Sequence, residues 1–131
     1  MAKQTGLGGD AYLGIRPAYL VVPMALEDSA RVLAVSETDP AGATVNVANP
    51  VRGTFEVVSD PRLDDFNPAG WFLAASPGMT DTIELAFLDG QATPYLESKD
   101  GWDIDGISYK VRHSFAAVCL DYRGLFYNDG A

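Results

Sequence analysis

Cysteine and histidine are almost missing from this chain, which contains one of each. A single cysteine, Cys119, cannot form an internal disulfide, so nothing in the sequence points to an oxidising compartment. Cys119 lies inside an apolar run, where a buried and inert thiol is expected. A single histidine, His113, leaves few ways to assemble acid–base catalysis.

Long apolar segments are also missing. No stretch approaches the roughly 18 consecutive apolar residues that cross a bilayer. The first ten residues contain one lysine and lack the apolar core of a secretory signal. The sequence therefore predicts a soluble protein that does not enter membranes.

Basic residues are few and scattered. Nine Lys and Arg residues stand against eighteen Asp and Glu residues, for a net charge of −9. Neutralising phosphates requires a stripe of Lys and Arg, and this sequence contains no such stripe. Specific nucleic-acid binding is therefore not expected.

The length and composition are those of one globular domain. With 131 residues and 47% hydrophobic content, the chain is large enough to bury a core without a metal or a disulfide. Residues 1–14 contain four glycines and little pattern, which predicts a flexible N-terminal arm. Residues 15–131 are expected to form a single α+β domain.

The longest segment without Gly or Pro covers residues 107–123, between Gly106 and Gly124. Its residues alternate as in a strand: the first face carries Ile107, Tyr109, Val111, His113, Phe115, Ala117 and Cys119, and the second carries Ser108, Lys110, Arg112 and Ser114. From Ala116 onward the second face is apolar too, which predicts burial on both sides. Unless a bend near Ser114 breaks it, such a strand reaches ~50 Å. It suits a scaffold better than a catalytic pocket.

The remaining pattern predicts one helix and several shorter strands. Leu26, Ala30 and Leu33 follow Pro23 at helical spacing, so a helix is expected over residues 24–36. Strands are expected over residues 18–22 and 54–58, and a β-hairpin over residues 71–75 and 82–88 with its turn at Pro77–Gly78. Residues 37–52 and 59–70 read as loops, the first with a short strand at 44–47. This order predicts an α+β fold with a largely antiparallel sheet and one main helix.

A catalytic triad is not favoured. His113 has Ser114 beside it and Asp121 further on, but consecutive strand residues point to opposite faces, so Ser114 and His113 do not converge. A half-buried structural histidine is expected instead. A small carboxylate-based hydrolase, or a piece of a protease, remains the alternative class.

Six acidic residues raise the question of a calcium site: Asp60, Asp64, Asp65, Asp100, Asp103 and Asp105. Residues 103–106 match only a fragment of an EF-hand loop, because Gly101 and Arg112 stand where acidic ligands are needed. Turns and solvated loops explain these acids better, and no metal or cofactor is predicted. Trp102 is the exception among the aromatic residues, since its Gly- and Asp-rich turn marks a candidate interface. A calcium- or glycan-binding module is the second alternative.

Four blocks of the sequence resemble a known family. They are residues 1–6, residues 16–27, residues 71–77 together with 82–90, and residues 103–127. The more specific parts are Pro-Tyr-Leu-Glu at 94–97 and the segment 105–113 ahead of 121–125. In order and spacing they resemble the C-terminal part of the major capsid proteins of tailed bacteriophages. The resemblance is strongest to the Mu-like major head subunit and to fusions of prohead protease with major capsid protein.

The resemblance implies a structural protein without catalytic residues, part of a Hong Kong 97-like capsid fold. It implies self-association into the hexamers and pentamers of an icosahedral head, with small oligomers for this chain alone. The expected location is the virion capsid, and the bacterial cytoplasm before assembly. The resemblance covers nearly all of this chain but less than half of a typical family polypeptide, so a fragment or a truncated prophage gene is expected.

Overall fold

The computed structural model describes residues 1–39, 47–102 and 105–130. It divides into two compact units, which are described one at a time. The sheet unit contains Met1–Thr82 and Asp121–Ala131, and the ribbon unit contains Ile83–Leu120. The single domain expected over residues 15–131 stays a prediction.

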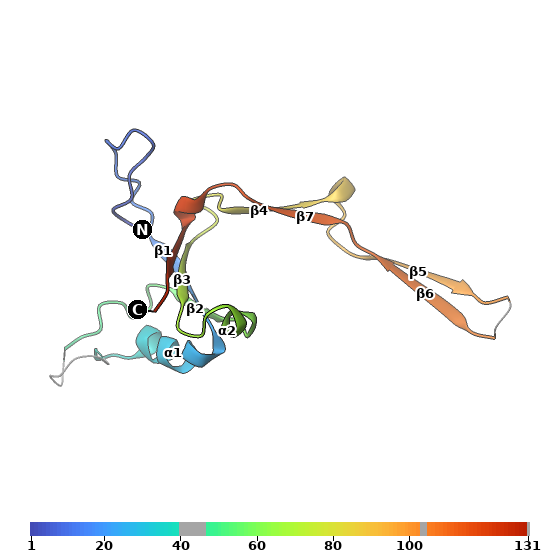
Figure 1. Ribbon diagram of the computed structural model, residues 1–131, viewed down its shortest axis with the longest axis horizontal. Helices are drawn as coiled ribbons and strands as arrows, with labels where there is room; N and C mark the ends of the chain where they lie inside the picture. Colours follow the sequence, from blue (N-terminus) through green and yellow to red (C-terminus); the bar gives the residue numbers. More distant parts are fainter. Residues whose placement is uncertain (40–46, 103–104, 131) are drawn as a thin grey trace. The chain divides into compact units, whose positions relative to one another are not determined.

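A four-stranded sheet forms the centre of the sheet unit, with strand order β2-β1-β3-β8 (Figure 1). The strands are β1 (Pro17–Val22), β2 (Glu56–Ser59), β3 (Trp71–Ala75) and β8 (Leu125–Asn128). β1 pairs with β2 in parallel, while the β1–β3 and β3–β8 pairs are antiparallel. The predicted α+β class, with mostly antiparallel strands and one main helix, is confirmed.

The main helix, α1 (Glu27–Val35), follows a 3₁₀ turn at Met24–Leu26, so the predicted helix over 24–36 is confirmed with a tighter first turn. No side chain of its own segment caps the start. Instead Asp64 accepts hydrogen bonds from the backbone N–H groups of Met24 (3.0 Å) and Ala25 (3.1 Å). A distant carboxylate therefore satisfies the exposed donors at this helix start.

The other end of α1 is closed by Asn49, a buried polar residue in the segment predicted as an exposed loop. Its Nδ2 donates to the carbonyl oxygens of Leu33 (2.7 Å) and Ser36 (3.1 Å), and its Oδ1 accepts from the N–H of Val51 (3.0 Å). The amide thus satisfies carbonyls that the helix end leaves unpaired. The short strand predicted at 44–47 lies largely outside the described residues.

The loop predicted over residues 59–70 contains a short helix, α2 (Arg62–Phe66), and that prediction is corrected. Asp60 accepts from the backbone N–H of Arg62 (2.9 Å) and also pairs with its guanidinium. That guanidinium lowers the pKa of Asp60 to about 2. A helix of one turn leaves no periodic pattern, which is why the sequence does not reveal it.

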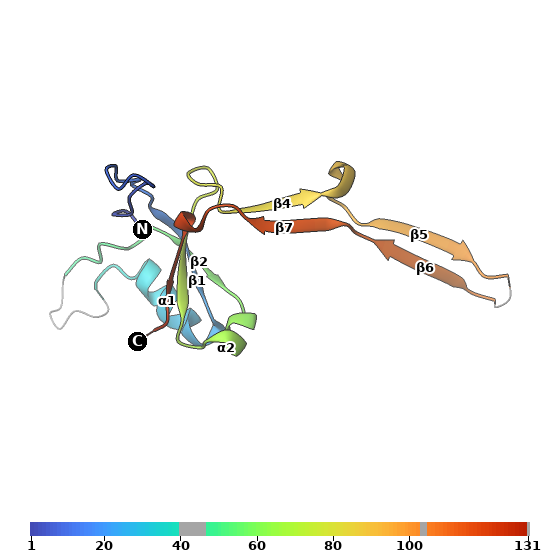
Figure 2. The same ribbon diagram turned by 45° about the horizontal axis from the view of Figure 1, so that its top comes forward.

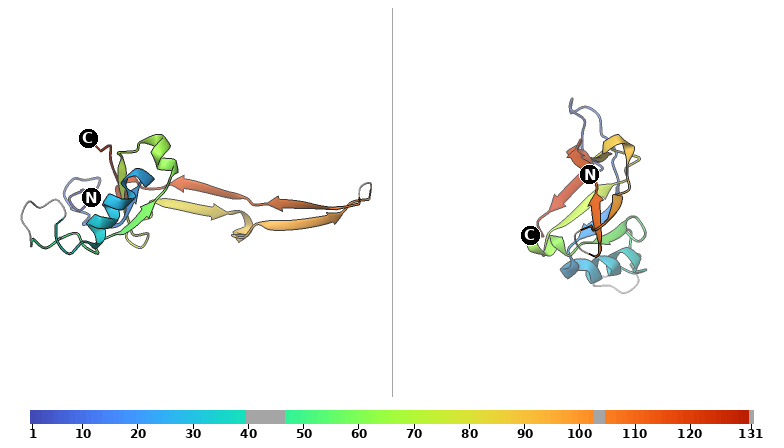
Figure 3. Two further views of the ribbon diagram at one scale, coloured as in Figure 1. Left: turned by 90° about the horizontal axis from the view of Figure 1, so that it is seen from below. Right: turned by 90° about the vertical axis from the view of Figure 1, so that its right-hand side faces the viewer.

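The core of the sheet unit lies between α1 and one face of the sheet (Figure 3). Leu20 and Val22 from β1 and Ala30 from α1 are buried there. Five partly buried residues pack around them: Leu26, Phe55, Val57, Trp71 and Leu73. Between β3 and β8, the rings of Phe72 and Tyr127 contact each other in a tilted arrangement, with their centroids 4.7 Å apart. The predicted apolar strand at 18–22 is therefore central to the core.

The N-terminal segment folds back on itself through a bridge between Thr5 and Tyr12. The N–H of Leu13 donates to the carbonyl of Gln4 (2.9 Å), and the N–H of Gly6 donates to that of Ala11 (3.0 Å). The flexibility expected of residues 1–14 stays a prediction.

The ribbon unit consists of two successive two-stranded antiparallel pairs (Figure 2). β4 (Ile83–Phe87) pairs with β7 (Phe115–Cys119), and β5 (Tyr95–Asp100) pairs with β6 (Ile107–Arg112). The long strand predicted over 107–123 is divided at residues 113–114, near the bend at Ser114 that the sequence permits, and it ends at Cys119. Opposite this break the chain forms a 3₁₀ turn, Leu88–Gly90, with Asp89 at a positive φ of 54°. The extra residues on one strand act as an enlarged bulge and end the regular pairing.

The predicted hairpin between residues 71–75 and 82–88 is wrong. β3 pairs with β1 and β8, while β4 pairs with β7. The connecting segment 76–82 is longer than the two to five residues that usually join a hairpin. β3 and β4 are therefore neighbours in the sequence, but each of them pairs with strands from other parts of the chain.

Candidate subunit interface on the ribbon unit

Side chains of the ribbon unit are in contact with solvent almost throughout. Of its described residues, all are exposed except Phe87, which is intermediate. Phe115 is 62% exposed and Val118 is 53% exposed, so the predicted burial on both faces is wrong within a single chain. The thiol of Cys119, expected to be buried, is exposed as well. The reason is that two strands form one layer, and a core requires a second.

The β4–β7 ribbon has one face without a polar side chain. Residues directly opposite each other in an antiparallel pair point to the same face. The register therefore gathers Ile83 with Cys119, Leu85 with Ala117, and Phe87 with Phe115. The opposite face carries Glu84 with Val118 and Ala86 with Ala116.

The β5–β6 ribbon has two faces of opposite character. Its apolar face carries the pairs Leu96–Val111, Ser98–Tyr109 and Asp100–Ile107. Its charged face carries the pairs Tyr95–Arg112, Glu97–Lys110 and Lys99–Ser108. These assignments confirm the alternation predicted for residues 107–112.

The charged face is satisfied by contacts of its own. Lys110 Nζ lies 3.1 Å from the Glu97 carboxylate, and the Arg112 guanidinium lies 5.5 Å from the centre of the Tyr95 ring. The apolar face has no comparable cover, since Tyr109 is 68% exposed and Val111 is 67% exposed. Charged pairs are stable in water, whereas exposed apolar rows favour contact with another surface. The two faces of the ribbon therefore differ in character, and the apolar face is the better candidate for contact with another surface.

The junction between the two ribbons holds His113. Its ring contacts those of Phe87 and Phe115, with centroid distances of 5.7 and 5.2 Å. The side chain is exposed, so the half-buried histidine predicted from the sequence is corrected. A polar hollow of about 380 Å³ adjoins it, lined in part by Asp89 and Arg112.

Three of the acidic residues considered for catalysis or calcium make local contacts. Asp121 accepts from the N–H of Arg123 (2.9 Å) and pairs with its guanidinium (3.4 Å). Asp60 and Asp64 support α2 and the start of α1, as described above. Among residues 1–39, 47–102 and 105–130 no group of three His, Cys, Asp or Glu is placed to hold a metal. Asp103 lies outside the described residues.

Trp102 occupies the turn that joins β5 to β6. Its side chain is 99% exposed. The N–H of Gly101 donates to the carbonyl of Gly106 (2.8 Å) and closes the base of this turn. A fully exposed tryptophan is unusual, because its large apolar surface is normally buried in a core or an interface. The predicted role of Trp102 as an interface marker stays a prediction, and its exposure agrees with that role.

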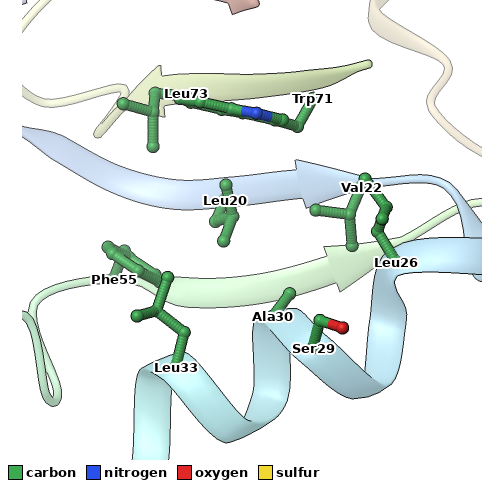
Figure 4. Close-up of a pocket in the computed structure, with 9 residues that line it drawn as sticks. All are labelled: Leu20, Val22, Leu26, Ser29, Ala30, Leu33, Phe55, Trp71 and Leu73. Carbon is green, nitrogen blue, oxygen red and sulfur yellow. The ribbon is translucent and has the colours of Figure 1, made fainter. Parts of the chain in front are cut away.

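The sheet unit carries an apolar groove of about 370 Å³ between α1 and the sheet (Figure 4). Side chains of Leu26, Ser29, Ala30 and Leu33 face it from the helix side, and the remaining lining residues are Leu20, Val22, Phe55, Trp71 and Leu73. The groove exists because α1 covers the apolar face of the sheet incompletely. The sequence did not reveal it, since its lining comes from four separate segments.

The geometry describes a protein with exposed apolar strands, a charged face already paired, and an open apolar groove. These are features of a subunit that associates with others. A scan against protein-family models matches residues 1–128 to the family of phage capsid proteins, and the chain belongs to that family. Membership indicates a structural capsid protein that forms part of the virion. Searches of curated proteins and of solved structures return no match.

Within the part of the chain that the structure describes, no helix is long and apolar enough to cross a membrane.

Proposed function

We propose that this protein is a shell-forming subunit of a phage head and that it self-associates through its ribbon unit. The observation that supports this most directly is the exposed apolar surface of the ribbon, together with the single-layer construction of its two strand pairs. A two-stranded ribbon is marginally stable at best in water, and gains stability when another layer covers it. A neighbouring subunit is the natural source of that layer in a repeating shell.

The available surface is sufficient for a specific interface. Leu85 is 57% exposed and Leu96 is 62% exposed, and other apolar residues of the ribbon unit are exposed to a similar degree. At on the order of 100 Å² for each such side chain, eight of them approach the ~800 Å² per partner of a standard interface. Repetition by symmetry then converts a modest contact into a stable shell.

The finer parts of the proposal follow the resemblance of the sequence blocks. The chain corresponds to the C-terminal part of a Mu-like major head subunit with a Hong Kong 97-like fold. It assembles into hexamers and pentamers, and this chain alone forms small oligomers. The proposed role involves no catalysis, no specific nucleic-acid binding and no membrane. The subunit passes through the bacterial cytoplasm before it enters the capsid.

Sedimentation velocity over a concentration series tests self-association. We expect the wild-type chain to form oligomers at micromolar concentration and Leu85→Glu to remain monomeric, because a carboxylate on the apolar face opposes its burial. Glu84→Gln, on the other face of the same strand, is the matched control and retains association. A wild-type chain that remains monomeric at every concentration contradicts the proposal.

Cys119 provides an independent measurement. The thiol is exposed in the single chain and lies on the apolar face of the β4–β7 ribbon. Its rate of reaction with a maleimide should therefore fall at least tenfold when oligomers form. An unchanged rate in a sample that contains oligomers places the interface elsewhere.

A further inference from the structure

The most exposed large hydrophobic side chain among the described residues of the ribbon unit, that of Trp102, lies at one end of the β5–β6 ribbon, where it is 99% exposed. Trp102 occupies the turn, and Ile107, the first residue of β6, is 58% exposed. Tyr109 and Val111 continue the same face along β6. On β6 the residues Ile107, Tyr109 and Val111 thus form one exposed apolar row, with Asp100 and Ser98 of β5 opposite its first two members.

The groove of the sheet unit has the complementary character. Its floor includes the buried residues Leu20, Val22 and Ala30, so the opening leads to the hydrophobic core. The lining is almost entirely apolar, and its polar side-chain groups are the Ser29 hydroxyl and the Trp71 indole nitrogen. Its volume of about 370 Å³ falls within the ~300–1,000 Å³ of pockets that hold whole ligands, so it has room for a large side chain.

We propose that Trp102 and the apolar face of the β5–β6 ribbon dock into this groove on a second copy of the chain. The inference rests on the proposed self-association and deepens it by naming one pair of contacting surfaces, in addition to the apolar face of the β4–β7 ribbon. The indole ring fills the groove beside Leu33 and Phe55. The Ser29 hydroxyl accepts the indole N–H, which usually finds a partner when a tryptophan is buried.

The exposed area and the symmetry of a ring both favour a second copy as the occupant. Trp102 and the exposed residues of the apolar face offer on the order of 600 Å², close to the ~800 Å² per partner of a stable interface. Closed rings such as hexamers and pentamers are formed by heterologous contacts, in which one surface meets a different surface of the next subunit. This chain carries two unlike apolar surfaces, the exposed face of the β5–β6 ribbon and the groove beside α1.

Cross-linking between two single-cysteine variants tests the contact. In a Cys119→Ala background, the full-length Trp102→Cys chain is mixed with the Ser29→Cys chain and oxidised. We expect a disulfide-linked heterodimer at a yield at least tenfold above that obtained with Asp28→Cys, an exposed neighbour on the same helix that does not line the groove. Equal yields for the two helix positions overturn the docking.

The outcomes separate this inference from the proposed function. If Trp102→Cys links mainly to itself in oligomers, a ribbon-to-ribbon contact replaces the docking and self-association stands. If the wild-type chain forms no oligomers, both fall. Trp102→Cys removes the proposed anchor, so a second measurement keeps Trp102 intact. In the Trp71→Phe variant Trp102 is the one remaining tryptophan, and its fluorescence emission is recorded. We expect its emission to shift to shorter wavelength on association, and an unshifted spectrum in confirmed oligomers overturns the docking.

Discussion

The sheet unit and the ribbon unit contain strands of similar composition but use them differently. In the sheet unit, Leu20 and Val22 of β1 are buried because α1 covers them. In the ribbon unit, Tyr109 and Val111 of β6 have the same spacing on one face and remain exposed. The difference teaches that an apolar row in a strand predicts a contact, and that the contact can lie in another molecule. The proposed self-association supplies that contact from a second copy of the chain.

The comparison is tested most strongly by one truncation in each unit. Leu20→Ala should lower the free energy of unfolding by about 3 kcal/mol, because it leaves a cavity in the core. Leu85→Ala should change the unfolding of the monomer by less than about 0.5 kcal/mol, as an exposed substitution does. Urea unfolding followed by circular dichroism measures both. A large loss for Leu85→Ala in a monomeric sample would mean that the ribbon is stabilised within the chain.

Asn49 tests how much a buried polar contact contributes to the sheet unit. In Asn49→Asp a carboxylate oxygen replaces the donor that faces the carbonyls of Leu33 and Ser36. The loss of two hydrogen bonds and the repulsion between oxygens should cost about 2–3 kcal/mol. Thermal unfolding at neutral pH measures the change. Glu97→Gln, which breaks an exposed ion pair of the ribbon, is the control and should alter stability by less than about 1 kcal/mol.

Asp64 tests the cap that α2 provides to the start of α1. Asp64→Ala should destabilise the sheet unit by about 1 kcal/mol, since two backbone N–H groups lose their acceptor. Asp65→Ala, at the exposed neighbouring position, is the matched control. Urea midpoints at pH 7 give the comparison. Equal midpoints for the two variants would show that water replaces the cap without cost.

The smallest effect is expected from the pH dependence of Asp60. The Arg62 guanidinium lowers the pKa of this carboxyl from 3.8 to about 2. Because the folded pKa lies below the unfolded value, the stabilisation is present above pH 3.8 and is lost as the pH falls towards 2. Asp60→Asn should therefore differ from wild type at pH 5 and approach it near pH 2. A constant difference across this range would contradict the linkage.

Several elements of the sheet unit were predictable because local chemistry favours them. Pro23 and the spacing of Leu26, Ala30 and Leu33 indicate the helix, and the β-branched and aromatic residues of β1 and β3 indicate strands. The partners of those strands were not predictable, as the false hairpin shows. Pairing of β3 with β8 joins residues more than fifty positions apart, and no local signal encodes that choice.

The proposed interface was only partly visible in the sequence. The alternation along β6 and the isolated Trp102 both pointed to a surface, and the register of β5 with β6 confirms the alternation. The burial expected for Phe115 and Cys119 was wrong, because an apolar pattern does not determine whether a second layer of the same chain covers these side chains. The groove required α1, β1, β3 and the segment before β2 to meet in space.

The sequence by itself determined the acidic surface, the main helix, the strand-forming segments and the two faces of the β5–β6 ribbon, because these depend on charge and on the period of side-chain directions. The tertiary structure alone decided which strands pair, how Asn49 and Asp64 close the two ends of the α1 region, and that the ribbon lacks a covering layer within the chain. The physical reason is that a side chain is buried only when a second surface covers it, and the sequence of one strand does not specify that second surface.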